Sequence, residues 1–325
     1  MTDTRSQQTL HIPARDVPMP ASVSDRAKAI LAMPRPQMPP YPPVENIDAW
    51  RQMVAGMNSA MVPVMQARAG NVDADVTDRM ISGVRTYDIR PRSVAADDRR
   101  VVLDIHGGAY ILCFGDACRA QAAGVAKDLR RRVISVDYRS PPDHPYPAPL
   151  DDCIAVYNAL VGEHGAKNII VGGASAGANL TAALVLRARD EGLPVPAGAI
   201  MHTPHLDMTN GSDSLYANQG LDAVLSGPDM TSIRTLYSGG HDFTHPYLSP
   251  LFGDFTKGFS PSFLSTGTRD LFLSDTVRMH AALRSADIPA ELHVTEAASH
   301  GNFHGAPEEE HINREVRKFI DKIWN

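Results

Sequence analysis

A serine flanked by small residues lies where an apolar stretch gives way to helix-forming residues. The segment 172–177 (Gly-Gly-Ala-Ser-Ala-Gly) follows the apolar run 168–171 and precedes a helical pattern over 179–189. A sharp strand-to-helix turn presents a serine hydroxyl to a neighbouring base, and the base converts a weak nucleophile into a reactive one. The segment therefore predicts that Ser175 is a nucleophile.

The glycines of this segment have a steric purpose. Gly173 and Gly177 stand two residues on either side of Ser175, where side chains would press the incoming strand against the outgoing helix. Because glycine, alanine and serine are common in loops, the pattern taken alone also fits a structural turn. The rest of the chain has to decide between the two interpretations.

A second glycine pair follows an earlier apolar run. Residues 99–105 are typical of a buried strand, and this strand leads into His106 and then Gly107 and Gly108. Successive glycines let backbone N–H groups face the negative oxygen that forms during acyl transfer. We expect Gly107 and Gly108 to form an oxyanion hole with the N–H of Ala176 at the helix start. The alternative is a plain glycine turn.

A nucleophilic serine needs a base and an acid, which this kind of turn delivers in the chain order serine, acid, histidine. Residues 261–267 predict a strand that ends close to Asp270, so Asp270 is the expected acid. Asp275 is the competitor. It lies beyond Ser274, a predicted helix N-cap, so we expect Asp275 in the first helical turn.

The base should follow the next strand, which the alternation of residues 290–295 predicts. The loop after it carries two histidines, His300 and His304. Either one is placed to serve as the base. His304 is alternatively half of a His-x-x-x-His metal pair with His300.

These motifs resemble the bacterial hormone-sensitive-lipase-like branch of the α/β hydrolases. The resemblance is carried by residues 106–110 (His-Gly-Gly-Ala-Tyr), by 136–147 and by 172–177, and it runs from about Val101 to the C-terminus. It implies an α/β-hydrolase fold, with a mainly parallel central sheet flanked by helices and a helical cap. Ala174, where the family usually has an acidic residue, and Ala109, in place of a third glycine, depart from the family pattern.

The resemblance also implies the chemistry. The family's base stands in a His-Gly-Phe-like stretch, which selects His300, and the implied activity is that of a serine carboxylesterase acting on short- to medium-chain esters through an acyl-enzyme, without a cofactor. Residues 265–283 resemble lactone hydrolases of the same family, so lactone hydrolysis is the runner-up. Plant receptors with this fold and without the histidine make noncatalytic ligand binding a further alternative.

Four segments are expected along the chain. Residues 1–70 form a proline-rich strap and cap helices, 71–204 and 248–325 form the catalytic core, and 205–247 form a cap insertion of short helices and turns. Strands are further predicted over 81–90 and 133–136, and helices over 22–33, 119–131, 150–161 and 307–323.

The predicted cap helix 47–65 carries methionines at every fourth position, Met53, Met57, Met61 and Met65, and Pro63 is expected to kink or end it before Met65. This methionine stripe either lines the substrate pocket or packs the cap onto the body. We assign Met53, Met57, Tyr110 and His205 to the substrate pocket.

Composition limits the other classes of function. A chain of 325 residues with 43% hydrophobic content can bury one full core, and a net charge of −6 without a basic stripe argues against nucleic acid or anionic membranes as partners. No stretch approaches the roughly 20 apolar residues of a membrane span. The expected partner is a small-molecule ester, with a homodimer as a further expectation from similar proteins.

The cysteines and the remaining histidines do not predict a metal site. Cys113, Cys118 and Cys153 lack the spacing of a disulfide framework, which favours a reducing, cytoplasmic location and small packed side chains. His202, His205, His241 and His245 lie close in sequence. We expect these histidines to cap turns or pair with nearby aspartates, and we expect no metal.

Overall fold

The protein is described by a computed structural model that covers residues 10, 13–34, 40–225 and 230–325. Part of the predicted proline strap, and Gly227 and Pro228 of the predicted insertion, lie outside the described residues. The strands are β1 (Ala74–Ile81), β2 (Val84–Pro91), β3 (Val101–Ile105), β4 (Val133–Val136), β5 (Ile169–Ala174), β6 (Gly198–His202), β7 (Ser262–Gly267) and β8 (Ala290–Thr295). The helices are α1 (Asp25–Leu31), α2 (Ile47–Ala69), α3 (Asp116–Leu129), α4 (Ala148–His164), α5 (Ala176–Asp190), α6 (Ser214–Ala217), α7 (Thr231–Ser238), α8 (Leu273–Ser285) and α9 (Pro307–Trp324).

The strands of the described residues form one sheet in the order β1-β2-β4-β3-β5-β6-β7-β8. Strand β2 is antiparallel to both of its neighbours, and every other pair is parallel. Parallel neighbours need crossover connections, and helices supply them here, so the sheet is covered on both faces. The mainly parallel α/β-hydrolase sheet predicted from the sequence is confirmed.

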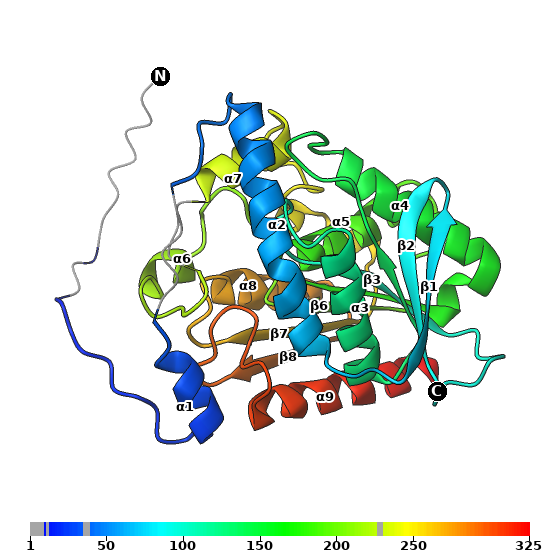
Figure 1. Cartoon of the computed structure of the whole chain (residues 1–325). Coiled ribbons are helices and arrows are strands. Elements are labelled where there is room, and N and C mark those ends of the chain that lie inside the picture. Colours follow the sequence, from blue (N-terminus) through cyan, green and yellow to red (C-terminus); the bar gives the residue numbers. More distant parts are fainter. Residues whose placement is uncertain (1–9, 11–12, 35–39, 226–229) are drawn as a thin grey trace.

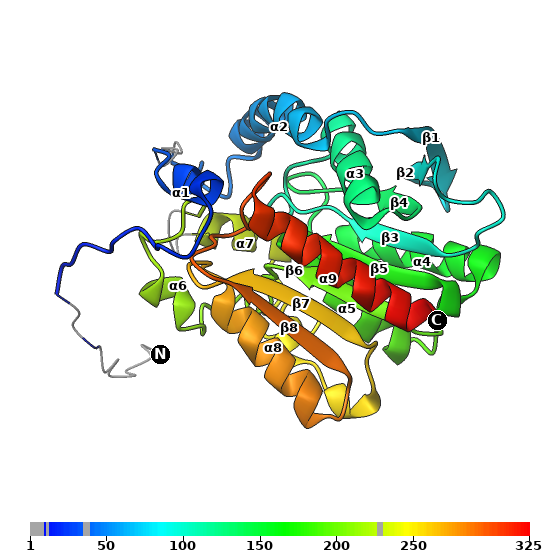
Figure 2. The same cartoon turned by 90° about the horizontal axis from the view of Figure 1, so that it is seen from below.

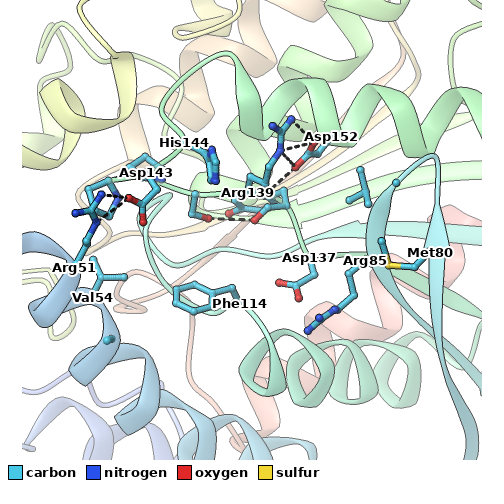
Figure 3. A pocket seen from close by; sticks show the side chains of 17 residues that line it. Arg51, Val54, Met80, Arg85, Phe114, Asp137, Arg139, Asp143, His144 and Asp152 are labelled. Carbon is cyan, nitrogen blue, oxygen red and sulfur yellow. Dashed lines mark hydrogen bonds and ion pairs between the residues drawn. The ribbon is translucent and has the colours of Figure 1, made fainter. Parts of the chain in front are cut away.

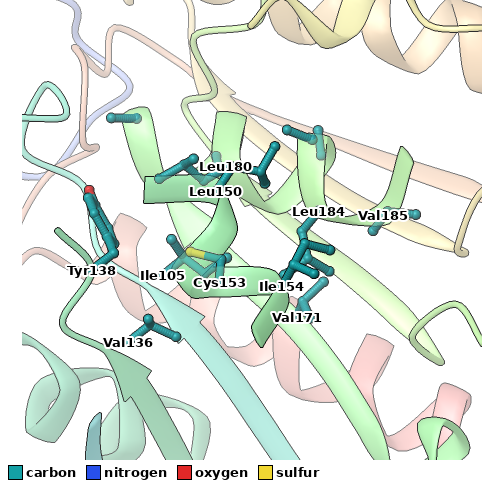
Figure 4. Packing of buried hydrophobic residues seen from close by; sticks show 14 of the residues in the cluster. Ile105, Val136, Tyr138, Leu150, Cys153, Ile154, Val171, Leu180, Leu184 and Val185 are labelled. Carbon is teal, nitrogen blue, oxygen red and sulfur yellow. The ribbon is translucent and has the colours of Figure 1, made fainter. Parts of the chain in front are cut away.

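Each face of the sheet has its own hydrophobic core. Helices α4, α5 and α8 cover one face, and α3 and α9 cover the other (Figures 1 and 2). Because side chains alternate along a strand, Leu103 and Ile105 of β3 join the first core, whereas Val102 joins the second. Figure 4 shows the first core, where Cys153 of α4 packs against Ile105 and its neighbours.

The N-terminal helices lie against the body of the protein at two places. Helix α1 packs through Ala27 and Leu31, together with Val23 just before it, on the loop that follows β8. Helix α2 lies beside α3 (Figure 1). Contrary to the prediction, Pro63 does not end α2, which continues to Ala69. Pro63 is exposed, so the carbonyl group that its missing N–H leaves unpaired faces water.

The insertion between β6 and β7 contains short elements, as the density of turn residues predicted. Helices α6 and α7 are four and eight residues long. Among the described residues, none of the helices combines the length and the hydropathy that crossing a bilayer would require.

Candidate active site

Ser175 stands at the turn between β5 and α5. Its backbone has φ 57° and ψ −119°, a conformation that is costly for a residue with a side chain. The backbone N–H of Ser175 donates to the carbonyl oxygen of His202 at 2.9 Å, and Ser175 forms the N-cap of α5. Its side chain stays partly exposed between two buried elements. The strand and the helix therefore hold the strained turn with the hydroxyl accessible.

The glycines around Ser175 are sterically required. A Cβ built on Gly173 would lie 2.5 Å from the carbonyl carbon of Gly177, and a Cβ on Gly177 would overlap the carbonyl oxygen of Ile105. Real Cβ atoms do not approach backbone so closely, so a side chain at either position would push β5, α5 and β3 apart. The structure thus agrees with the steric reason inferred from the sequence.

The predicted oxyanion residues converge on this turn. A Cβ built on Gly107 would lie 3.6 Å from Cβ of Ser175, and Gly108 has φ +109°, which L side chains rarely adopt. Within the described part of the chain, the N–H groups of Gly107, Gly108 and Ala176 donate no hydrogen bond to protein. Backbone donors that are mostly buried seldom lack an acceptor, so these three are available to a ligand.

The predicted acid and base form a pair. Nδ1 of His300 lies 3.1 Å from Oδ1 of Asp270, whose side chain is fully buried. The other carboxylate oxygen of Asp270 accepts the hydroxyl of Thr266 at 2.8 Å, and Oδ1 also accepts the N–H of Phe272 at 2.9 Å. The ring of Phe272 meets the His300 ring edge to face, with centroids 5.1 Å apart. These contacts fix the position of the carboxylate and of the imidazole.

Electrostatics favour the protonated form of this histidine. Burial opposes a charged His300, but the carboxylate of Asp270, with a smaller contribution from Asp222, outweighs it and raises the pKa of His300 above its ordinary value. Among the described residues, the hydroxyl of Ser175 makes no hydrogen bond to His300. Catalytic contacts of this kind are often long before substrate binds and shorten in the complex.

The geometry matches a known protein family. Residues 102–304 match the family model described as alpha/beta hydrolase fold. The chain belongs to the α/β hydrolase family. The matched range spans β3 to the histidine loop and so includes all of the predicted catalytic residues.

Comparison with individual proteins places the hydrolase in the hormone-sensitive-lipase-like branch. It is 36% identical over 216 residues to an esterase of Acinetobacter venetianus, which covers 64% of this chain and 68% of the esterase. The crystal structure of esterase E25 superposes with a TM-score of 0.88 at 34% identity, covering 97% of this chain and 98% of the other. The hormone-sensitive-lipase homologue EstE7, from a metagenome library, superposes with a TM-score of 0.76 at 25% identity over 88% of this chain and 99% of its own.

A second carboxylate, which the sequence analysis did not single out, adjoins the acid and the base. Asp222 of the hydrolase is 1% exposed, and its Oδ2 accepts the backbone N–H of His300 at 3.2 Å and that of Leu271 at 3.1 Å. Oδ1 of Asp222 accepts the N–H groups of Val224 and Leu225. One side chain of the insertion thus contacts the loops after β7 and β8.

Neighbouring residues reinforce this link. Nδ2 of Asn218 donates to the carbonyl oxygens of Thr268 and Asp270 at 3.1 and 2.8 Å. The N–H of Ala223 donates to Oγ of Ser299 at 2.9 Å. No local pattern in the sequence marks these residues, because their partners in the loops after β7 and β8 lie 49 to 78 positions away.

The competing acid, Asp275, has a different role from the one predicted. It lies in the first turn of α8, but the N-cap is Phe272 and not Ser274. Asp275 is fully buried, accepts the N–H groups of Leu206 and Asp207 through Oδ2, and accepts the hydroxyl of Ser212 through Oδ1. Asp275 therefore anchors the start of the insertion instead of decorating an exposed helix end. Burial raises the pKa of Asp275 to about 7.

The residues assigned to the substrate pocket divide into two groups. Met53 and Met57 of α2 are partly buried, and Met53 packs against the main core. Tyr110 and His205 are buried and touch each other, with the hydroxyl of Tyr110 3.2 Å from Nδ1 of His205. Tyr110 also stacks on Tyr237 at 3.9 Å between ring centroids. Both residues pack inside the protein, and contact of any of the four with substrate remains a prediction.

The other histidines have separate partners. Nδ1 of His304 lies 2.7 Å from Oε1 of Glu309 on α9, so His304 pairs with a different carboxylate from that of His300. Nδ1 of His202 lies 2.6 Å from Oγ of Ser265, whereas His241 and His245 pack against the ring of Tyr146.

A cavity of about 510 Å³ lies beside helix α2, apart from these histidines (Figure 3). Helix α2, the β1–β2 hairpin and the loop 137–144 line it. Its walls carry two ion pairs, Arg51 with Asp143 and Arg139 with Asp152. Ser175, Asp270 and His300 are not among the described residues that line this cavity.

Proposed function

We propose that this carboxylic ester hydrolase is a serine esterase with Ser175 as nucleophile, His300 as base and Asp270 as acid. The observation that carries the proposal is the junction at Ser175, where a strained, partly exposed serine adjoins three N–H groups without protein acceptors. The His300–Asp270 pair supports it, because Asp270 accepts a hydrogen bond from Nδ1–H and so leaves the lone pair of Nε2 free to act on the serine.

The reaction proceeds in two halves. Nε2 of His300 removes the hydroxyl proton as Oγ of Ser175 bonds to the ester carbonyl carbon, and the N–H groups of Gly107, Gly108 and Ala176 bind the oxyanion. Collapse of the tetrahedral intermediate breaks the bond to the alcohol, which takes the proton from His300. Water then attacks the acyl-serine by the same route. Each oxyanion donor contributes on the order of 3 kcal/mol to the barrier reduction.

The proposed substrates are small-molecule esters with short- to medium-length acyl chains. Tyr110, two residues after Gly108, stacks on Tyr237, and both rings are buried. Rings that fill the interior there support a pocket that accepts only acyl chains of limited length. Hydrolysis of p-nitrophenyl acetate, butyrate, octanoate and palmitate tests this: we expect kcat/KM to fall sharply for palmitate. Equal rates for palmitate and butyrate would contradict the proposed acyl-length preference.

Ser175→Ala tests the nucleophile. We expect kcat for p-nitrophenyl butyrate to fall by about a million-fold, because the serine and its base act as one unit. Ser285→Ala, which alters an exposed serine at the end of α8, is the control and should keep full activity. Retained turnover in a folded Ser175→Ala protein would refute the assignment.

His300→Ala and His304→Ala distinguish the two candidate bases. We expect kcat to fall by several orders of magnitude in the first variant and to change little in the second, because His304 pairs with Glu309. The opposite order would assign the base to His304.

A further inference from the structure

Three potential metal ligands meet on the sheet face that α3 covers. Adjacent parallel strands β3 and β4 pair Ile105 with Val136, so the next residues, His106 and Asp137, lie side by side. Cys118 in the first turn of α3 reaches the same point. The ligand atoms of His106, Cys118 and Asp137 all lie within 4.8 Å of one another. Imidazole, thiolate and carboxylate together are a donor set typical of zinc.

The imidazole of His106 is oriented as a metal ligand would be. Its ring is fully buried, and Nδ1 lies 2.8 Å from the carbonyl oxygen of Gly107, so Nδ1 carries the proton. Nε2 then presents a lone pair, and among the described residues it has no hydrogen-bond partner. The ring stacks on Tyr138 with centroids 4.0 Å apart, which fixes its plane. Metal-binding histidines usually have such a backbone carbonyl behind the other ring nitrogen.

Hydrogen bonds from neighbouring residues also fix the positions of the other two donors, Asp137 and Cys118. Oδ1 of Asp137 accepts the N–H of Gly115 at 3.0 Å, and Oδ2 accepts the hydroxyl of Tyr87 at 3.1 Å. Sγ of Cys118 lies 3.4 Å from Oγ of Ser135, which itself donates to Asp104 at 2.8 Å. Each carboxylate oxygen keeps a second lone pair for a metal.

We propose that His106 Nε2, Cys118 Sγ and the Asp137 carboxylate bind one Zn²⁺ ion. Zinc bonds of about 2.0 to 2.3 Å place neighbouring tetrahedral ligands about 3.5 Å apart. Because the three donor atoms lie within 4.8 Å of one another, each pair needs a closure of about 1.3 Å at most. The sulfur–zinc bond forms as the thiol of Cys118 releases its proton to solvent, which leaves the fourth position to water. Asp137 also lines the cavity of Figure 3.

The position of the site matters because Gly107 and Gly108 follow His106 directly. A bound ion holds the end of β3 from which these two glycines project. The sequence analysis expected no metal and did not consider these three donors together, because they come from separate segments without ligand spacing. The proposal does not depend on the catalytic roles assigned above.

Cobalt is the spectroscopic probe for this site. The full-length protein is freed of metal with a chelator, its thiols are kept reduced, and Co²⁺ is added. We expect a near-ultraviolet thiolate-to-cobalt charge-transfer band that saturates at one equivalent. Cys118→Ser should abolish the band, whereas Cys153→Ser, which alters another buried thiol in α4, should keep it.

Zinc is then tested by thermal unfolding. Zn²⁺ should raise the melting temperature of the parent and of Cys153→Ser, because an ion that binds only the folded state stabilises it. Asp137→Asn should weaken zinc affinity by more than about tenfold. If circular dichroism shows that Cys118→Ser does not fold, Asp137→Asn serves as the test variant in its place. Three outcomes would overturn the proposal: a band that persists in Cys118→Ser, no band in the folded parent, or the same zinc-induced rise in melting temperature in all variants. They would indicate a buried water or adventitious surface binding instead.

Discussion

The carboxylate of Asp222 accepts the backbone N–H of His300 at 3.2 Å, although the two residues lie 78 positions apart. The same oxygen accepts the N–H of Leu271, next to the proposed acid Asp270. A single buried charge in the insertion thus holds together the two loops on which the acid and the base depend. It also favours the protonated form of His300, because its negative charge raises the pKa of that residue.

Asp222→Asn should therefore change both rate and pH dependence. The base must be neutral to act, so activity rises with pH through the pKa of His300. Removing a charge that raises this pKa moves the acidic limb of the kcat/KM profile to lower pH. We also expect kcat to fall by about tenfold, or about 1.4 kcal/mol, because the amide replaces one accepting oxygen with a donor.

The control for this variant is Asp97→Asn, which removes an exposed carboxylate in the loop before β3. Its rate and profile should match those of the parent. An Asp222→Asn enzyme with an unshifted acidic limb would show that the carboxylate does not act on His300.

Asp275 should make stability depend on pH. Burial raises its pKa from 3.8 to about 7, so folding favours the protonated form. This contribution is present below about pH 4 and is lost as pH rises to about 7, at no more than about 1.4 kcal/mol per pH unit. Asp275→Asn keeps an oxygen for Leu206 and Asp207 and cannot ionise. Urea unfolding across this range should give a flatter pH profile for the variant; parallel profiles would contradict the raised pKa.

The docking of α1 should control the mobility of the histidine loop. Ala27 is fully buried against a cluster that includes Ala298 and Phe303, on either side of His300. Ala27→Glu buries an unpaired charge and should release the helix, with faster amide hydrogen exchange over 297–303 and a severalfold lower kcat. Ala29→Glu, on the exposed face of the same helix, should leave both unchanged. Equal exchange in the two variants would show that α1 does not restrain the loop.

Two glycine-to-alanine changes should have opposite effects on stability. Gly177→Ala places a Cβ against the carbonyl oxygen of Ile105 and should lower the free energy of unfolding by at least about 3 kcal/mol, with loss of activity. Gly162 lies exposed in α4, and a Cβ at this position would meet only open space, so Gly162→Ala should raise the free energy of unfolding by about 1 kcal/mol. Denaturant unfolding measures both. A stable, active Gly177→Ala enzyme would contradict the close packing of β3 and α5.

Much of the core was predictable from sequence because its elements are short apolar runs with clear ends. Strands β4 and β8 have the predicted bounds, and β7 begins one residue later than predicted. Helix α2 was predicted too short because Pro63 was expected to kink or end it, whereas in the structure Pro63 is exposed and the helix continues to Ala69. Exposure depends on tertiary packing, which a single sequence does not report.

The candidate site was predictable only in part. The serine turn and the glycine pair follow from local motifs, and chain order points to Asp270 and to one of two histidines. The choice of His300 over His304 came from the family resemblance. The contributions of Asp222 and Asn218 do not, because hydrogen bonds across 49 to 78 residues leave no periodic signal. The buried position of Asp275 was missed for the same reason: its partners lie in the insertion, more than 60 residues earlier.

Asn58 links helix α2 to the chain that follows the glycine pair Gly107–Gly108. Its Nδ2 donates to the carbonyl oxygen of Phe114 at 3.2 Å, and its Oδ1 accepts the N–H of Cys113 at 2.7 Å. Chimaeras that exchange the first 70 residues between relatives to alter selectivity would therefore also disturb catalytic turnover, unless the donor helix carries an asparagine in register. Engineering of this enzyme should therefore treat helix α2 and the proposed oxyanion residues together.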